Sequence, residues 1–245
     1  MPARFFVRDG IAPTDVGSMV ELPEDVAHHA IRVARIGTGD TLALFDGAGG
    51  EYRATLVEIT RRSARARIDA YIPADREPAL AVTLVMAIVA TDAMDYGVRK
   101  AVELGARAIE PVITARSAPM PAGDRAQRRH AHWREIAIAA CEQCGRNRIP
   151  DVRMPIALQA YAPDADETLL VCAPVSSAPS LSTVELAASR CAIAIGPEGG
   201  WTDSELAALT QRGATLVQLG PRVLRADTAA VTALAIIQAR WGDLR

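Results

Sequence analysis

The feature of this sequence that most restricts its fold is a run of almost entirely apolar residues, LAVTLVMAIVA, at 80–90. Such runs are typical of strands that are buried on both faces, as in a parallel sheet. Three shorter segments share this character, at 168–172, 191–195 and 215–219. Helical patterns separate or follow them, at about 92–104, 124–144, 202–212 and 228–241. The alternation predicts an α/β domain with helices on both faces of its sheet.

The first 72 residues follow a different pattern. Residues 41–59 contain two strand-like runs around the glycine-rich turn DGAGG, which predicts a β-hairpin. Further strands are expected in RFFVRD and SARARIDAYI, and a helical pattern covers 23–36. The polar, proline-bounded segment PADREP (73–78) is the predicted linker. We therefore expect a small β-rich unit at 1–72 and an α/β domain at 79–245.

The composition excludes several classes of protein. Half of the 245 residues are hydrophobic and the net charge is −2, which allows a sizeable core and gives no general attraction to nucleic acid or membrane. The N-terminal segment lacks the apolar core of a signal peptide, and no apolar stretch is long enough to span a bilayer. We therefore expect a cytoplasmic protein that does not enter the membrane.

Histidines and cysteines predict no metal or redox site. The pairs His28–His29 and His130–His132 have no carboxylate cluster of the usual kind beside them, so we expect no metal. The C-x-x-C pair of Cys141 and Cys144 falls late in a predicted helix, where the helix dipole disfavours a thiolate. Ordinary packing is the interpretation that we favour for these two cysteines.

Arginines gather in two places. The segment 124–148 contains six arginines against three carboxylates, and the first unit contains a second cluster, Arg61, Arg62, Arg65 and Arg67. Two such clusters in different units are able to hold one polyanion. A solvated protein surface has the same appearance, so charge alone leaves both interpretations open.

The loop IGPEGG at 195–200 follows a predicted buried strand but fits neither common phosphate-binding motif. Thr202 and Glu205 form a T-x-x-E capping box, which predicts that a helix begins directly after the loop. The glycines would let the backbone approach a ligand closely. An ordinary proline-glycine turn is the alternative.

A second loop, LGPRVLRAD at 219–227, leads from a predicted strand into a helix that is apolar on nearly all sides. Such a helix is buried against the sheet or against another subunit. Asp227 is the predicted N-cap of this helix. Arg222 and Arg225 precede it and are expected to face the IGPEGG loop.

Four segments together carry a resemblance: RKAVELGARAIEPVITARS (99–117), EQCGRNRIP (142–150), IGPEGGWTDSE (195–205) and LGPRVLRADTA (219–229). With HHAIRVARIGTGD (28–40), they resemble the 16S ribosomal RNA (uracil-N3)-methyltransferases of the SPOUT superfamily. The resemblance implies a PUA-like β-barrel that binds RNA, followed by a SPOUT-type α/β domain with a C-terminal trefoil knot. It also implies a homodimer whose S-adenosyl-L-methionine sites lie close to the subunit interface.

The resemblance assigns residues to the cofactor, and the placement of the two loops suggests residues for catalysis. The cofactor-binding residues would be Val171, Cys172, Ala173, Ile195, Gly196, Gly199, Leu219, Gly220 and Leu224. Arg225 is the first candidate for catalysis, followed by Glu198 and Asp227. The residues expected to contact RNA are Arg4, Arg32, Arg35, Arg61, Arg62, Arg65, Arg116 and Arg146.

The predicted function is methylation of uridine N3 in small-subunit ribosomal RNA, within an assembled or assembling 30S subunit, with S-adenosyl-L-methionine as methyl donor. Two alternatives stay open. Another SPOUT enzyme, which methylates a ribose 2′-hydroxyl or a different base, would share the cofactor loops. A non-catalytic RNA-binding module would not need the cofactor.

Overall fold

The computed structural model of the protein describes residues 2–8, 10–11, 16–60, 63–187 and 189–244. The chain divides into two compact units, and the first is built from two separate segments, Met1–Glu77 and Cys141–Ile149. The second unit contains Pro78–Ala140 and Pro150–Arg245. The sequence pattern places all of 79–245 in the α/β domain, whereas the structure assigns 141–149 to the first unit.

A five-stranded sheet forms the frame of the first unit. Its strands are β1 (Ala3–Phe6), β2 (Met19–Leu22), β3 (Thr41–Phe45), β4 (Glu51–Ile59) and β5 (Ala64–Ile72). Their order is β1-β3-β4-β5-β2, with β1 parallel to β3 and the other pairs antiparallel. The β3–β4 pair is the hairpin that the glycine-rich turn predicts. In β5, Ala64, Ala66 and Ile68 are buried while Arg65 and Arg67 are exposed, which explains the alternation in the sequence.

The helical pattern at 23–36 forms two short helices in succession, α1 (Glu24–His28) and the π-helix η2 (His29–Val33). Val26, Ala27 and Ala30 from these helices join the apolar core of the first unit, beside residues such as Phe5 and Leu56. Val26, Ala30 and Ile31 of the pattern therefore face the core, as their spacing predicts, whereas Val33 and Ala34 are exposed.

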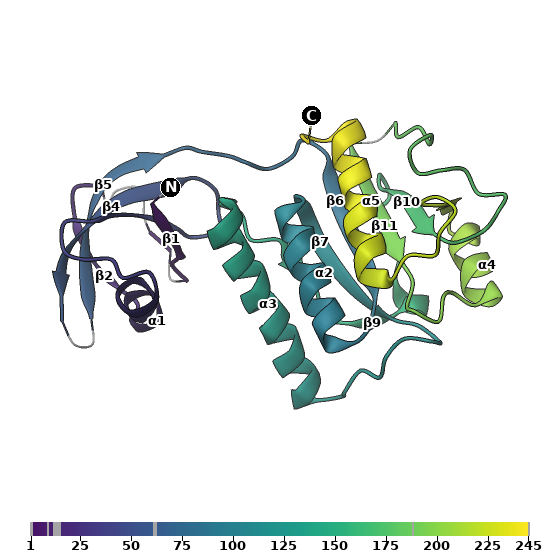
Figure 1. Ribbon diagram of the computed structural model, residues 1–245, viewed down its shortest axis with the longest axis horizontal. Helices are drawn as coiled ribbons and strands as arrows, with labels where there is room; N and C mark the ends of the chain where they lie inside the picture. The colour runs from purple at the N-terminus through teal and green to yellow at the C-terminus, as the bar shows by residue number, and fades with distance from the viewer. Residues whose placement is uncertain (1, 9, 12–15, 61–62, 188, 245) are drawn as a thin grey trace. The chain divides into compact units, whose positions relative to one another are not determined.

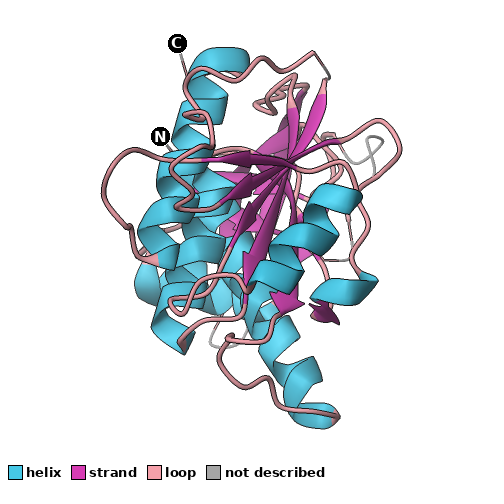
Figure 2. Cartoon of the chain, turned by 90° about the vertical axis from the view of Figure 1, so that its right-hand side faces the viewer, coloured by secondary structure: helices cyan, strands magenta, loops and turns pink. Residues whose placement is uncertain are grey.

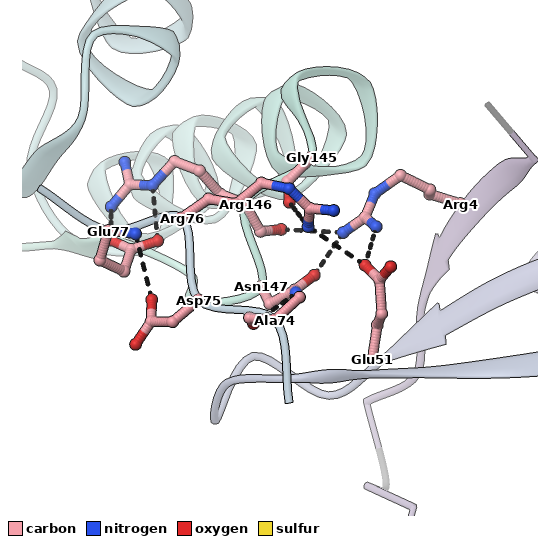
Figure 3. A network of polar contacts seen from close by, with 9 residues as sticks. All are labelled: Arg4, Glu51, Ala74, Asp75, Arg76, Glu77, Gly145, Arg146 and Asn147. Carbon is pink, nitrogen blue, oxygen red and sulfur yellow. Dashed lines mark hydrogen bonds and ion pairs between the residues drawn. The ribbon is translucent and has the colours of Figure 1, made fainter. Parts of the chain in front are cut away.

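A buried polar network closes the first unit (Figure 3). Arg4 on β1 is 9% exposed, and its guanidinium is paired with Glu51 on β4 and bonded to the side-chain oxygen of Asn147. Arg76 adds a second bond to Glu51, at 3.3 Å between Nη1 and Oε2. Burial alone would raise the pKa of Glu51, but the hydrogen bonds from both arginines outweigh burial and hold this pKa below its usual value.

The same network fixes the segment 145–147 (Figure 3). Arg146 is buried, and its guanidinium forms two hydrogen bonds to the carboxylate of Glu77. Arg76 donates to the carbonyl of Gly145 at 2.8 Å, and Asn147 donates to the carbonyl of Ala74 at 3.0 Å. These contacts are the physical reason why 141–149 belongs to the first unit.

The second unit contains a parallel sheet with helices on both sides of it (Figures 1 and 2). The strands are β6 (Ala81–Ala87), β7 (Ala106–Ile113), β8 (Asp151–Val152), β9 (Ile156–Ala157), β10 (Thr168–Cys172), β11 (Arg190–Ile195) and β12 (Thr215–Val217). They run in the order β12-β10-β11-β6-β7-β8, and β9 also pairs with β7. Every pairing in this sheet is parallel, which confirms the predicted α/β class.

The helices are α2 (Thr91–Glu103), α3 (Asp124–Cys144), α4 (Asp203–Gln211) and α5 (Ala226–Trp241), and Leu158–Ala160 forms the 3₁₀-helix η3. The helices α2 and α5 pack against each other and against the sheet. Met86 of β6 faces α2, where Gly97 leaves room for its sulfur. Val85, the preceding residue, packs in a cluster with Leu209 of α4 on the opposite side. The apolar run at 80–90 is therefore buried on both faces, as the sequence predicts.

The helix ends follow ordinary capping rules. Thr202 and Glu205 form the predicted capping box of α4. Gly105 after α2 and Gly213 after α4 have φ angles of 75° and 86°, which suit glycine as a helix stop. Among the described residues, no helix is long and apolar enough to cross a membrane.

Candidate functional site

Three neighbouring strands deliver their loops to one edge of the parallel sheet. Cys172 ends β10 and is paired in register with Ile195, which ends β11, and with Val217, which ends β12. The chain segments that follow these three ends line a cavity that is open to solvent. Ligands of α/β proteins bind at the carboxyl ends of the strands, so this cavity is the candidate site.

The cavity brings together most of the residues that the resemblance assigns to the cofactor. Cys172, Ala173, Ile195, Gly196, Leu219, Gly220 and Leu224 line it. Val171 and Gly199 do not. Val171 is fully buried within β10, and a Cβ atom at Gly199 would point toward the side chain of Arg116. These two residues therefore lie next to lining residues without contacting the cavity themselves.

The lining is almost free of charge. Glu198 and Arg222 are its only ionisable groups apart from the thiol of Cys172, and the other lining residues are apolar, glycine, or the neutral Trp201 and Gln218. Burial raises the pKa of Cys172 to about 12, so this thiol stays protonated. Such a lining lacks the cluster of cations that is typical of a phosphate site. It suits a ligand without phosphate groups.

The glycines of the IGPEGG loop make room for side chains. A Cβ atom at Gly196 would lie 3.0 Å from the indole of Trp201, and one at Gly199 would lie 3.1 Å from Cβ of Arg116. Gly200 has a φ of 70°, which disfavours other residues. The expectation that these glycines let a ligand approach is therefore incomplete, because Gly196 and Gly199 make room for the side chains of Trp201 and Arg116.

Trp201 and Glu205 hold the loop from two sides. The indole N–H of Trp201 donates to the carbonyl of Cys172 at 2.9 Å. Glu205 is 6% exposed and accepts from the N–H groups of Thr202 and Ala115, each at 2.8 Å. Burial alone would raise the pKa of Glu205, but these hydrogen bonds outweigh burial and lower the pKa. The capping box was foreseeable from the sequence, whereas the bond to Ala115 was not.

The three catalytic candidates lie at or beside the cavity. Glu198 is exposed and lines it. Arg225 and Asp227 stand at the start of α5, next to the lining residues Leu224 and Ala226, but do not themselves line the cavity. The prediction that Asp227 is the N-cap of α5 is wrong. Arg225 occupies that position, and the Asp227 carboxylate instead accepts from the N–H of Thr228 at 2.7 Å.

The arginines expected to contact RNA fall into different environments. Arg32, Arg35 and Arg65 are exposed. Arg116 is also exposed, and its guanidinium donates to the carbonyl of Gly199 at 2.9 Å. The prediction that Arg4 and Arg146 contact RNA is wrong, because both are buried and paired with carboxylates, which leaves no exposed guanidinium surface for a phosphate. Arg61 and Arg62 lie outside the described residues.

The histidines and the C-x-x-C pair take structural roles. His132 is paired with Asp95 at 2.7 Å, and a ring nitrogen of His130 lies 2.7 Å from the carbonyl of Val152. Cys141 is buried near the end of α3, and burial raises its pKa to about 12. In the part of the chain that the structure describes, no group of three or more potential ligand side chains is arranged to hold a metal ion.

Comparisons with known proteins agree with this geometry. The family model of the RNA methyltransferase domain matches residues 76–238, and that of the RNA methyltransferase PUA domain matches 22–69. A crystal structure of the ribosomal RNA small subunit methyltransferase E of Neisseria gonorrhoeae, bound to S-adenosyl methionine, has a TM-score of 0.91 and 35% identity, with all of both chains covered.

Relatives of the same description are found among curated proteins. The ribosomal RNA small subunit methyltransferase E of Synechocystis is 32% identical, over 94% of this chain and 76% of its own length. The enzyme of Mycobacterium bovis is 33% identical, over 93% of this chain and 90% of its own length. The similarity therefore extends through both units.

Proposed function

Because the chain belongs to the RNA methyltransferase family, we propose that it transfers a methyl group from S-adenosyl-L-methionine to N3 of a uridine in the 16S RNA of the small ribosomal subunit. The observation that carries this proposal is the cavity at the carboxyl ends of β10, β11 and β12. It lies where the family resemblance expects the cofactor loops.

The residues of the cavity fit this cofactor. S-Adenosyl-L-methionine supplies a methyl group on a positively charged sulfonium and contains no phosphate. Leu219, Leu224 and Ile195 offer an apolar surface for a planar base, and Glu198 offers the one carboxylate. The absence of a phosphate-binding motif in the IGPEGG loop then has a chemical reason.

Catalysis at uracil N3 requires a base held in line with the methyl group and the loss of the N3 proton. Negative charge develops on the two carbonyl oxygens beside N3. Arg225, exposed beside the cavity, is our candidate to stabilise this charge. Glu198 lines the cavity and is better placed to accept the proton than Asp227, whose carboxylate already binds the N–H of Thr228.

The first unit is proposed to hold the RNA. Arg32, Arg35 and Arg65 present exposed guanidinium groups there, and arginine binds phosphate through paired hydrogen bonds. We further propose that the substrate is the RNA within an assembled or assembling 30S subunit, that the enzyme acts in the cytoplasm where that RNA is found, and that the chain near the C-terminus forms the trefoil knot of SPOUT enzymes.

A homodimer is also part of the proposal. The helix α5 has buried residues on its sheet side, and Val231, Ala235 and Ile236 on it are only half-buried. Apolar side chains that remain partly exposed on a helix of this kind favour contact with a second subunit.

The test compares the nucleosides of 16S RNA, by mass spectrometry, from a strain that lacks the gene and from the same strain with the gene restored. We expect 3-methyluridine to disappear and return. Loss of a 2′-O-methylated nucleoside or of another methylated base would identify a different SPOUT enzyme. Calorimetry with S-adenosyl-L-methionine separates both from a non-catalytic RNA-binding module, which would show no binding.

A further inference from the structure

The loop after β11, residues 196–202, is held by residues at or just after the ends of β10 and β7; we call it the cofactor loop. On the β10 side, the indole of Trp201 donates to the carbonyl of Cys172. On the β7 side, the loop is joined to residues 114–118, which line no part of the cavity. A segment outside the cavity therefore contacts the loop that forms its wall.

The connection on the β7 side runs through Glu205, which uses both carboxylate oxygens. Oε2 accepts from the N–H of Thr202 at 2.8 Å and from its hydroxyl at 3.0 Å, which completes the capping box. Oε1 accepts from the N–H of Ala115 at 2.8 Å, 90 residues away in the chain. A capping box needs only the first of these interactions. The second one ties two loops together.

Arg116 strengthens the same connection. Its guanidinium donates to the carbonyl of Gly199 at 2.9 Å, in the middle of the cofactor loop. A Cβ atom at Gly199 would lie 3.1 Å from Cβ of Arg116, so a larger residue there would require a small shift of one of the two segments. Nη1 of Arg116 therefore supports the backbone of the cofactor loop directly.

The 114–118 segment is itself firmly placed. The hydroxyl of Ser117 accepts from the N–H of Thr114 and donates to its carbonyl, each at 3.1 Å. The N–H of Ala118 donates to the carbonyl of Ile88, just beyond the end of β6, at 2.8 Å. The segment is therefore a fixed support against which Glu205 and Arg116 hold the cofactor loop.

From this geometry we infer that Glu205 and Arg116 are positioning residues for the cofactor site: they fix the cofactor loop against residues 114–118 and thereby set the affinity for S-adenosyl-L-methionine. The inference rests on the proposed function. It assigns Arg116 a role in place of the RNA contact that the family resemblance suggests. Neither side chain touches the cavity, so their effect is on binding and not on the methyl transfer itself.

The experiment uses Glu205→Gln in the full chain, with Asp203→Asn as matched control. Asp203 is an exposed carboxylate in the same helical turn, so the control loses the same charge without touching the support. The amide that replaces the carboxylate in Glu205→Gln has a single acceptor oxygen, so the N–H of either Thr202 or Ala115 loses its partner. We expect the Kd and KM for S-adenosyl-L-methionine to rise about tenfold in Glu205→Gln, with kcat within about threefold of the unmodified chain. Asp203→Asn should stay within about twofold in each constant.

A second variant keeps the test informative if Glu205→Gln fails to fold. Arg116→Gln alters an exposed side chain and should raise the Kd for the cofactor about threefold with unchanged affinity for 16S RNA. The inference is overturned if both variants bind the cofactor like the control, or if Arg116→Gln weakens only RNA binding. Failure of the proposed function is a separate result, because the unmodified chain would then bind no S-adenosyl-L-methionine.

Discussion

The arginines buried in the first unit and those at the cavity of the second unit have opposite roles. In the first unit, Arg4 and Arg146 are buried and paired with Glu51 and Glu77, so their charges are spent inside the protein. In the second unit, Arg222 and Arg225 are exposed beside the cavity. Burying a charge is costly unless it is paired and hydrogen-bonded, so the buried arginines specify one arrangement of the chain. Arg222 and Arg225 are placed where they are able to act on a ligand.

The carboxylates show the same contrast. Glu51 accepts bonds from two arginine side chains, so removing it would leave charge unpaired in the interior. Glu205 accepts from backbone N–H groups, so removing it would disconnect two loops without leaving a buried charge unpaired. We therefore expect changes in the first network to alter stability, and changes around the cavity to alter function.

The largest expected effect is that of Arg225→Ala. Loss of a group that stabilises developing charge should lower kcat by about a hundredfold or more. The Kd for S-adenosyl-L-methionine should stay within about threefold, since Arg225 does not line the cavity. Single-turnover methylation of 16S RNA and calorimetry measure the two quantities. Near-normal turnover would remove Arg225 from the mechanism.

Glu51→Gln tests the other side of the comparison. Without the carboxylate, the guanidinium of Arg4 stays buried beside a neutral amide, which should cost about 3 kcal/mol in the free energy of unfolding of the first unit. Denaturant titration followed by circular dichroism measures this loss. The control Glu58→Gln removes half of an exposed ion pair with Arg65 and should cost less than about 0.5 kcal/mol. A similar cost for both variants would contradict the distinction.

Reversing two exposed charges of the first unit should have a moderate effect on RNA. The double variant Arg65→Glu, Arg67→Glu is expected to weaken 16S RNA binding about tenfold at low salt and to reduce the salt dependence by about two counterions. Filter binding at several salt concentrations measures both. Arg107→Glu, at an exposed site on β7 in the second unit, is the control. Unchanged binding by the double variant would make Arg65 and Arg67 an ordinary solvated surface.

The smallest expected effect concerns acid. The pKa of Glu51 is held below its usual value of 4.5 in the folded protein, so its contribution to stability is complete above that value and is lost as the pH falls through the folded pKa. The stability difference between the unmodified chain and Glu51→Gln should be constant above about pH 5.5 and should shrink in more acidic solution. Urea titrations at successive pH values follow this difference. If the stability difference stays constant down to about pH 3, the charge of Glu51 is not its source.

Local patterns in the sequence predict much of this fold. The alternation in 63–72 predicts β5, and Thr202 with Glu205 predicts the start of α4, because each depends on residues close together in the chain. The strand β7 was not evident as a separate strand, since Arg107, Glu110 and Pro111 interrupt its apolar character. In the structure, Arg153 from a distant segment pairs with Glu110 and makes its burial tolerable.

The rest depends on contacts between residues far apart in the sequence. Asn147 joins the first unit because it binds Arg4, 143 positions earlier. Gly199 lies against Arg116, which no motif in the loop indicates. The family resemblance therefore indicated the residues of the cavity, since seven of the nine that it assigns to the cofactor line it, but it did not indicate the residues that hold the loop in place. Such support is visible only when strands distant in the chain are aligned.

The discontinuity of the first unit has a consequence for how the chain is made. Protein synthesis proceeds from the N-terminus, so the sheet of β1 to β5 emerges well before Arg146 and Asn147 exist. Until then Arg4, Arg76 and Glu77 lack the hydrogen bonds that they later form with residues 145–147. Completion of the first unit is therefore coupled in time to synthesis of the long helix α3, which must be finished before the N-terminal sheet acquires its last contacts.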